Sequence, residues 1–204
     1  MHIPRIGRGE NTNKKKLILV IAVLVFGVVS IVAGIGTMTN AGGGAAVTYE
    51  KYSSAEHGFS VNYPQNWIER MSVPGAAVYY NAPPLQVAAT SSWNDPASFN
   101  VQIPAPAGGK TLNQLVDESK LAVENMFPGI SFTNEKDVQV NGIKGHEWMV
   151  VVDNFSGSGV NATMKQDFFI ANDKVYTITF VAISEYYGDY ASTFDTILNS
   201  FTVL

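Results

Sequence analysis

Residues 17–36 constrain this chain more than any other stretch, because they are twenty consecutive residues without a charged side chain. The stretch is entered directly from Lys14, Lys15 and Lys16, and fourteen of its residues are Leu, Ile, Val or Phe. Each of these favours membrane insertion by roughly 0.3–0.6 kcal/mol, giving about −6 kcal/mol in total. A helix of this length extends about 30 Å, the thickness of the hydrocarbon layer. The stretch therefore predicts one transmembrane helix.

A cleavable signal peptide is the alternative interpretation, since a basic start, an apolar run and small residues near Ala41 are also its features. The run exceeds the roughly 7–15 residues usual in signal peptides, which favours a retained anchor. Orientation is the same in both cases. Five Lys/Arg precede the stretch and the next basic residue is Lys51, so the positive-inside rule keeps the N-terminus cytoplasmic. We expect a single-pass cell-membrane protein with residues 37–204 outside and the three lysines as its topology signal.

Four regions follow from this anchor. Residues 1–16 form a short basic tail of charge +4, and residues 17–36 are the predicted span. Residues 37–48 contain three consecutive glycines and predict a flexible Gly/Ala-rich linker. Residues 49–204 carry a net charge of −8 and have the length of one ordinary domain. This acidic domain argues against a nucleic-acid partner, because phosphate binding needs clustered Lys and Arg.

The chain has no cysteine. Disulfides, thiolate zinc sites and a cysteine nucleophile are therefore excluded. A domain outside the membrane must then be held together by its core alone.

Alternating apolar and polar residues predict strands in the outer domain. Asn141-Gly142 suits the two positive-φ positions of a type I′ hairpin turn, and Asn172-Asp173 is a weaker signal of the same kind. The strand after Asn172-Asp173 is mostly apolar on both faces, which predicts a central place in a sheet. The predicted strands cover residues 59–63, 77–80, 86–90, 99–103, 137–140, 143–152, 162–171 and 174–182.

Two stretches have helical periodicity. Thr111 and Gln114 match a capping box, and the apolar residues that follow share one face as far as Met126, before Pro128-Gly129. Residues 187–201 return to the same spacing. Hairpin-joined strands with helices at two points predict an α+β fold, an antiparallel sheet of about six to eight strands with one helix on each face.

The sequence GFSVNYPQNW occupies residues 58–67, and further motifs lie at the helix start Thr111-Leu112 and in residues 140–145, 175–180 and 197–201. In this order these motifs resemble those of PsbP-like proteins, and residues 58–67 are similar to the opening of that family. The resemblance spans about residues 49–204 and implies an α/β/α sandwich. For plant and cyanobacterial members it also implies an extrinsic photosystem II subunit that supports calcium and chloride retention. It supplies no ligand set that can be placed on this chain.

Two histidines in the outer domain each adjoin a glutamate, His57 beside Glu56 and His146 beside Glu147. A metal site needs three or more convergent ligands. On a strand His146 and Glu147 point to opposite faces, so we expect a core or edge histidine there and a surface residue at His57.

Calcium has no continuous binding loop in the sequence. A calcium site would have to be assembled from distant acids such as Asp153 and Asp173. We therefore expect no metal and no cofactor, with calcium as the alternative.

Catalytic motifs are weak. Ser156-Gly157-Ser158-Gly159 has its glycines at the wrong offsets for a Gly-x-Ser-x-Gly nucleophile turn. An esterase or peptidase would need a serine placed by the fold beside His57 or His146. The sequence favours a protein that is not an enzyme.

Asn154 and Asn161 each begin an Asn-x-Ser/Thr triplet in the loop over residues 153–161 and are possible glycosylation sites. The alternative is that such triplets arise by chance in a polar loop.

Five aromatic residues offer either a binding surface or additional core, since Tyr and Trp are common in interface hot spots. They are Tyr79, Tyr80, Trp93, Tyr186 and Tyr187.

These features favour a membrane-tethered, extracytoplasmic PsbP-like accessory domain that binds a protein partner or supports assembly of a membrane complex. The alternative is a small-ligand or calcium-type metal-binding domain, which the resemblance to photosystem II subunits implies.

Overall fold

The computed structural model describes residues 47–70, 73–84, 95–155 and 158–204. Across these ranges there is no helix long and apolar enough to cross a membrane. The predicted span at residues 17–36, the basic tail with Lys14, Lys15 and Lys16, the predicted strand at 86–90 and Trp93 all lie outside the described residues.

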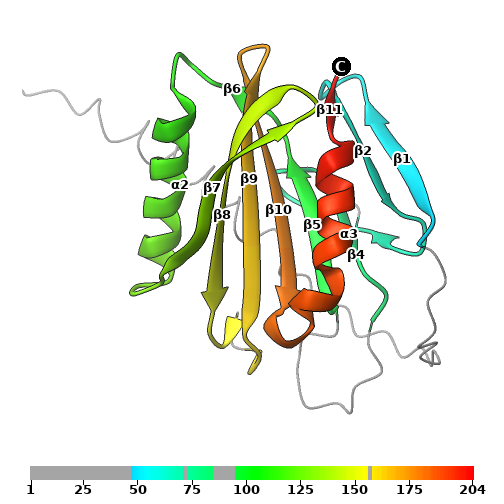
Figure 1. Cartoon of the computed structure of the whole chain (residues 1–204), viewed down its shortest axis with the longest axis vertical. Coiled ribbons are helices and arrows are strands. Elements are labelled where there is room, and N and C mark those ends of the chain that lie inside the picture. The colour runs from blue at the N-terminus through cyan, green and yellow to red at the C-terminus, as the bar shows by residue number, and fades with distance from the viewer. Residues whose placement is uncertain (1–46, 71–72, 85–94, 156–157) are drawn as a thin grey trace, which may run out of the picture.

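The described residues form two antiparallel sheets (Figure 1). The larger has the order β3-β4-β5-β10-β9-β8-β7, and β6 also pairs with β10. Its strands are β3 Ile68–Glu69, β4 Ala76–Asn81, β5 Ala97–Gln102, β6 Ala105–Pro106, β7 Phe132–Val140, β8 Ile143–Val152, β9 Ala162–Ala171 and β10 Lys174–Ile183. The smaller sheet has the order β1-β2-β11, with β1 Tyr49–Ser54, β2 Phe59–Pro64 and β11 Thr202–Val203.

Both predicted hairpins are confirmed. Asn141 and Gly142 have φ values of 48° and 83° between β7 and β8, and Asn172 and Asp173 have 51° and 57° between β9 and β10. Positive φ at both central residues is the type I′ geometry that suits the right-handed twist of paired strands. The prediction that β10 is central is also confirmed, because it pairs with β5 on one side and β9 on the other.

Helix α2, Leu112–Met126, covers one face of the larger sheet. Thr111 and Gln114 form the predicted capping box, which satisfies free amides at the helix start. Val116 and Val123 pack against Trp148 of β8 and against further apolar residues of β8 to β10, including Val150, Val152, Met164, Phe168 and Val181.

Helix α3, Tyr187–Ser200, covers the opposite face after a short 3₁₀ turn, η2 Ser184–Tyr186. Phe194 and Ile197 of α3 pack with Phe180 of β10 and with Phe59 of β2, so the small sheet shares this second core. The two helices therefore lie on the two faces of the larger sheet (Figure 1). The α+β fold with one helix per face is confirmed.

The small sheet differs from the single sheet that the sequence predicts. Residues 59–64 pair with β1 and with the chain end at Thr202–Val203 instead of joining the larger sheet. The two-residue strands β3, β6 and β11 are too short to produce an alternating pattern. Strand β7 begins at Phe132, five residues before the predicted start, because its exposed, charged middle hides the alternation.

Candidate functional site

Strand β9 places charged side chains on a face that is otherwise core. Lys165 and Asp167 are two residues apart, so both point to the α3 side of the sheet, as Phe169 does. The register of β8 with β9 sets Glu147 directly opposite Asp167 and Met149 opposite Lys165. Three ionisable groups from two neighbouring strands therefore meet beneath α3.

Lys165 is the centre of this cluster. Its Nζ lies 3.3 Å from Glu147 Oε2, 3.4 Å from Asp195 Oδ1 of α3 and 3.9 Å from Asp167 Oδ2. The same ammonium lies 5.0 Å from the centre of the Phe180 ring. Only 4% of the Lys165 side chain is exposed. The space between these carboxylates is thus filled by the protein's own cation.

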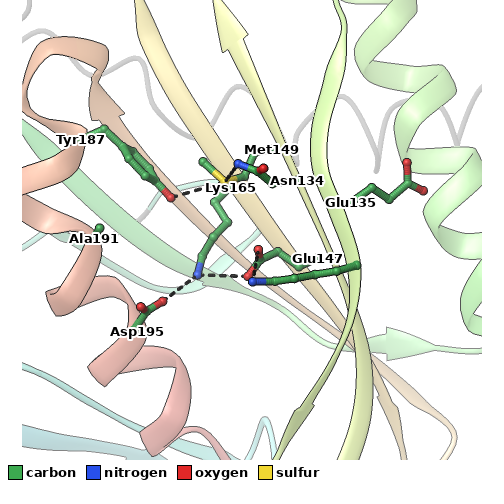
Figure 2. Close-up of a pocket in the computed structure, with 9 residues that line it drawn as sticks. Asn134, Glu135, Glu147, Met149, Lys165, Tyr187, Ala191 and Asp195 are labelled. Carbon is green, nitrogen blue, oxygen red and sulfur yellow. Dashed lines mark hydrogen bonds and ion pairs between the residues drawn. The ribbon is translucent and has the colours of Figure 1, made fainter.

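A pocket of about 300 Å³ opens above Lys165, between α3 and the edge strand β7 (Figure 2). In Figure 2 the Lys165 side chain reaches between Asp195 on α3 and Glu147 on β8. We call this the α3–β7 pocket, and its lining residues are Asn134, Glu135, Lys136, Glu147, Met149, Lys165, Tyr187, Ala191 and Asp195.

The β7 wall of the pocket is irregular. The register of β7 on β8 shifts between Thr133 and Lys136, and Asn134 has φ of 51°. Its side-chain amide lies 3.4 Å from the sulfur of Met149. Such bulges re-aim side chains and are common beside functional sites. Here the bulge separates Lys136, which pairs with Glu147 at 3.1 Å, from Glu135, which points away toward α2 (Figure 2).

Burial controls the protonation of the cluster. Burial has the largest effect and raises the pKa of Asp167, Lys165 lowers it and the neighbouring Glu147 raises it, and together they bring this pKa to about 8. As a carboxylate, Asp167 would accept no hydrogen bond from the described residues, whereas its protonated form can donate to Glu147. Asp167 is therefore neutral at pH 7.

Lys165 remains a cation. Burial alone would lower the pKa of its ammonium, but Asp167, Glu147 and Asp195 together raise that pKa above its ordinary value. An amine nucleophile needs a depressed pKa. The arrangement can hold charge and donate hydrogen bonds, but it does not supply a free amine.

The structure separates His146 from Glu147, as the sequence predicts. Glu147 points into the α3–β7 pocket, while His146 lies on the opposite face, 3.0 Å from Asp137 and 3.2 Å from Glu135 of β7. His146 is a half-buried histidine on β8, the strand next to the edge of the sheet, and it is held by two carboxylates. Within the described ranges no group of three or more His, Cys, Asp or Glu has the geometry to hold a metal ion.

The remaining candidate residues do not come together. His57 lies in the β1–β2 turn, where its amide donates to Ser54, and the imidazole of His146 bonds only carboxylates among the described residues. Asp153 follows the end of β8 and Asp173 precedes β10, at opposite ends of the ten-residue strand β9. At about 3.3 Å per residue, these two aspartates are too far apart to share a calcium ion.

The glycosylation candidates lie together in the loop after β8. The side-chain oxygen of Asn154 accepts from the amide of Gly159, and that of Asn161 accepts from the amide of Asn154. Both residues are exposed. Their use as sugar acceptors stays a prediction.

Two of the aromatic candidates belong to the interior. Tyr79 is buried and Tyr80 packs between Tyr63 and Phe99. Tyr187 lines the α3–β7 pocket, and its neighbour Tyr186 is half-buried in η2. Of the four that the structure describes, Tyr187 is the one that lines this pocket.

Sequence reasoning missed Lys165, Asp167 and Asp195. A signal was present in the sequence. Lys165-Gln166-Asp167 interrupts a strand whose other residues are mostly apolar, and the Asn172-Asp173 turn joins this strand to one that is predicted to be central. Charged residues in a buried strand need partners. The partner Asp195 lies thirty residues away in α3, so only the fold could identify it.

The sequence profile of the PsbP-like protein family matches residues 17–203. The chain belongs to the PsbP-like family. Among curated protein sequences none matches this chain. The family match covers the described domain and begins at the first residue of the apolar stretch.

Solved structures with the same fold come from distant organisms. Cyanobacterial PsbP from Synechocystis sp. PCC 6803 has a TM-score of 0.53 at 17% identity, over 83% of this chain and all of that one. LpqN of Mycobacterium tuberculosis, described as involved in cell envelope biogenesis, has a TM-score of 0.54 at 10% identity, over 78% of this chain and 92% of that one. The Ran-binding protein Mog1p of Saccharomyces cerevisiae has a TM-score of 0.52 at 12% identity, over 78% of this chain and 96% of that one. At these identities the likeness shows the fold alone.

Proposed function

We propose that this PsbP-like protein is held at the cell membrane by a helix over residues 17–36 and binds a protein partner on the outer side through the α3–β7 pocket. It acts as an accessory domain and not as an enzyme. The buried Lys165 beneath an open pocket is the observation that carries the proposal.

The argument for a functional site starts from the cost of the cluster. Removing the Lys165 ammonium and the Glu147 carboxylate from water costs several kcal/mol per ion, and their mutual attraction repays this only in part. Apolar residues of similar volume would stabilise the same place as well or better. Such a cluster at the base of an open pocket is therefore better explained by binding than by folding.

The pocket rim has the chemistry of a protein interface. Tyr187 and Met149 supply apolar contact area of the kind enriched in interfaces, while Lys136 and Asp195 place one charge of each sign on the two walls. A partner segment lying between α3 and β7 would meet both charges at once. Mog1p, which has this fold, is a Ran-binding protein, and that precedent supports a binding role.

The tether is supported by the sequence. The family match begins at residue 17, the start of the apolar stretch, and the positive charges that fix orientation precede it. The domain would then be presented at the outer membrane surface by the linker at residues 37–48.

Site-specific photocrosslinking in native membranes tests this function. A photoreactive amino acid at Ala191, in the pocket wall, should give an adduct of one defined mass. The same group at Leu121, exposed on α2 on the other side of the sheet, should not give it. Asp195→Lys in the Ala191 derivative should abolish the adduct. Equal adducts at both positions, or none at either, would overturn the proposal.

A further inference from the structure

A second pocket lies on the opposite face of the larger sheet. It has a volume of about 300 Å³ and lies between the start of α2, the short strand β6 and the neighbouring ends of β9 and β10. Leu115, Phe168 and Val175 supply its apolar wall, and Ile103 stands exposed at the rim. We call it the α2–β6 pocket. Its lining surface is mostly apolar, as in pockets that hold small molecules.

Thr177 contributes a polar side chain to this mostly apolar pocket. The residue is 4% exposed and lines the pocket; its backbone pairs with β9, but its side-chain hydroxyl makes no hydrogen bond with the described residues. Its polar neighbours have partners. Ser119 donates to Gln166 at 3.0 Å and Gln166 donates to Thr179 at 2.8 Å. Gln102, which also lines the pocket, is not without a partner. The Thr177 hydroxyl is not one of the side-chain atoms that are both fully buried and unpaired, so it is open to the pocket. It is therefore available to a bound molecule.

The charges at the pocket mouth cancel. Lys110 and Glu118 both line the pocket, and the Lys110 ammonium lies 2.6 Å and 2.8 Å from the two carboxylate oxygens of Glu118. A paired lysine offers no net attraction to an anion, and its partner offers none to a cation. The pocket thus selects against a charged ligand.

We infer that the α2–β6 pocket binds an uncharged aliphatic molecule with a single hydrogen-bonding group, of the size of a medium-chain alcohol. The polar group lies at Thr177 and the chain runs along Leu115, Val175 and Phe168. This site is independent of the α3–β7 pocket, which lies on the other face of the sheet.

The test uses the full chain in lipid nanodiscs, without detergent, and a ten-carbon alcohol that carries a photoreactive diazirine. Mass spectrometry should locate the label on peptides containing Leu115 or Phe168, and unlabelled 1-decanol should compete for it. Label that 1-decanol does not displace, or that is spread evenly over the domain, overturns the inference. Decanoic acid, the charged analogue, should compete at least tenfold more weakly, and equal competition overturns the selection against charge.

Two matched variants place the ligand. Leu115→Trp should fill the pocket and reduce labelling at least tenfold, whereas Leu121→Trp on the exposed side of the same helix should leave it unchanged. Thr177→Val keeps the volume and should weaken 1-decanol competition by about three- to tenfold, the value of one hydrogen bond. If Thr177→Val and Leu115→Trp both label like the parent chain, the pocket is not the binding site. The Thr177→Val result decides the matter if Leu115→Trp does not fold.

Discussion

Lys165 and Glu147 form an ion pair from which water is almost wholly excluded, with Nζ and Oε2 3.3 Å apart and side-chain exposures of 4% and 5%. They come from neighbouring strands, and Asp167 and Asp195 complete the surroundings of the ammonium. A pair of this kind contributes little net stability, yet removing one partner leaves the other as an uncompensated buried charge. Variants of the cluster should therefore differ clearly in stability.

Lys165→Met should destabilise the domain by about 3–5 kcal/mol, because Glu147 would keep a buried charge without its buried partner and with only the exposed Lys136 beside it. Denaturant unfolding of a fragment covering residues 47–204 measures the change. Asp195→Asn should cost less than about 1 kcal/mol, since 67% of the Asp195 side chain is exposed. The triple variant Lys165→Met, Glu147→Gln, Asp167→Asn should recover most of the loss. Equal losses for Lys165→Met and Asp195→Asn would contradict this account of the cluster.

The stability of the domain should depend on pH through Asp167. The folded protein holds this proton up to a pKa of about 8, whereas the unfolded chain releases it near the ordinary value of about 3.9. Between these values the folded state binds more protons, so the contribution of Asp167 to stability falls as pH rises, by up to about 1.4 kcal/mol per pH unit, and levels off above about 8.

Unfolding midpoints at pH 5, 7 and 9 test that dependence. Asp167→Asn imitates the protonated side chain and should remove the decline, so the variant should gain on the parent chain as pH rises. Parallel pH profiles for the two proteins would mean that Asp167 is ionised in the folded state throughout this range.

Gly145 of β8 leaves no room for a side chain between β8 and β9. A Cβ at this position would lie 2.6 Å from the backbone oxygen of Phe168 and against the ring of Phe169. Gly145→Ala should therefore cost about 1–3 kcal/mol in unfolding free energy. Gly188→Ala is the matched control, because its Cβ would meet nothing within 4 Å in α3 and the change should stabilise by about 0.5–1 kcal/mol. A neutral Gly145→Ala would show that β8 and β9 separate easily.

Asn141 connects the β7–β8 turn to the end of α3. Its side-chain amide donates to the backbone oxygens of Phe201 at 2.7 Å and Asn199 at 3.2 Å, and its φ is 48°. Asn141→Gly keeps the turn geometry and should cost about 1 kcal/mol for the lost hydrogen bonds. Asn141→Ala should cost about 1–2 kcal/mol more, because a side chain with Cβ is strained there. Equal thermal stability of the two variants would show that the positive φ at residue 141 does not strain a side chain with Cβ.

Local signals explain what the sequence could predict. The two hairpin turns and the Thr111–Gln114 capping box each depend on residues within four positions of one another, and all three form as expected. The small sheet could not be predicted, because β2 pairs with a two-residue strand about 140 residues later in the chain. A strand of two residues is too short to show an alternation of apolar and polar side chains.

The candidate site also has one feature that local sequence predicts and one that it does not. The alternation of β8 was enough to separate His146 from Glu147 onto opposite faces. It could not reveal that Glu147, Lys165 and Asp195 converge, because each lies on a different element and a charged residue in isolation predicts only a solvated surface. The unusual polarity of Lys165-Gln166-Asp167 was the available sign.

The placement of the domain outside the membrane is tested most directly by cysteine labelling in intact cells, since the chain has no cysteine of its own. Single cysteines are introduced at Glu56, exposed in the β1–β2 turn, and at Asn11 in the basic tail, and a membrane-impermeant maleimide is applied. We predict immediate labelling of Glu56→Cys and labelling of Asn11→Cys only after lysis. Protection of Glu56→Cys until lysis, with or without labelling of Asn11→Cys, would contradict the proposed topology and the partner site that depends on it.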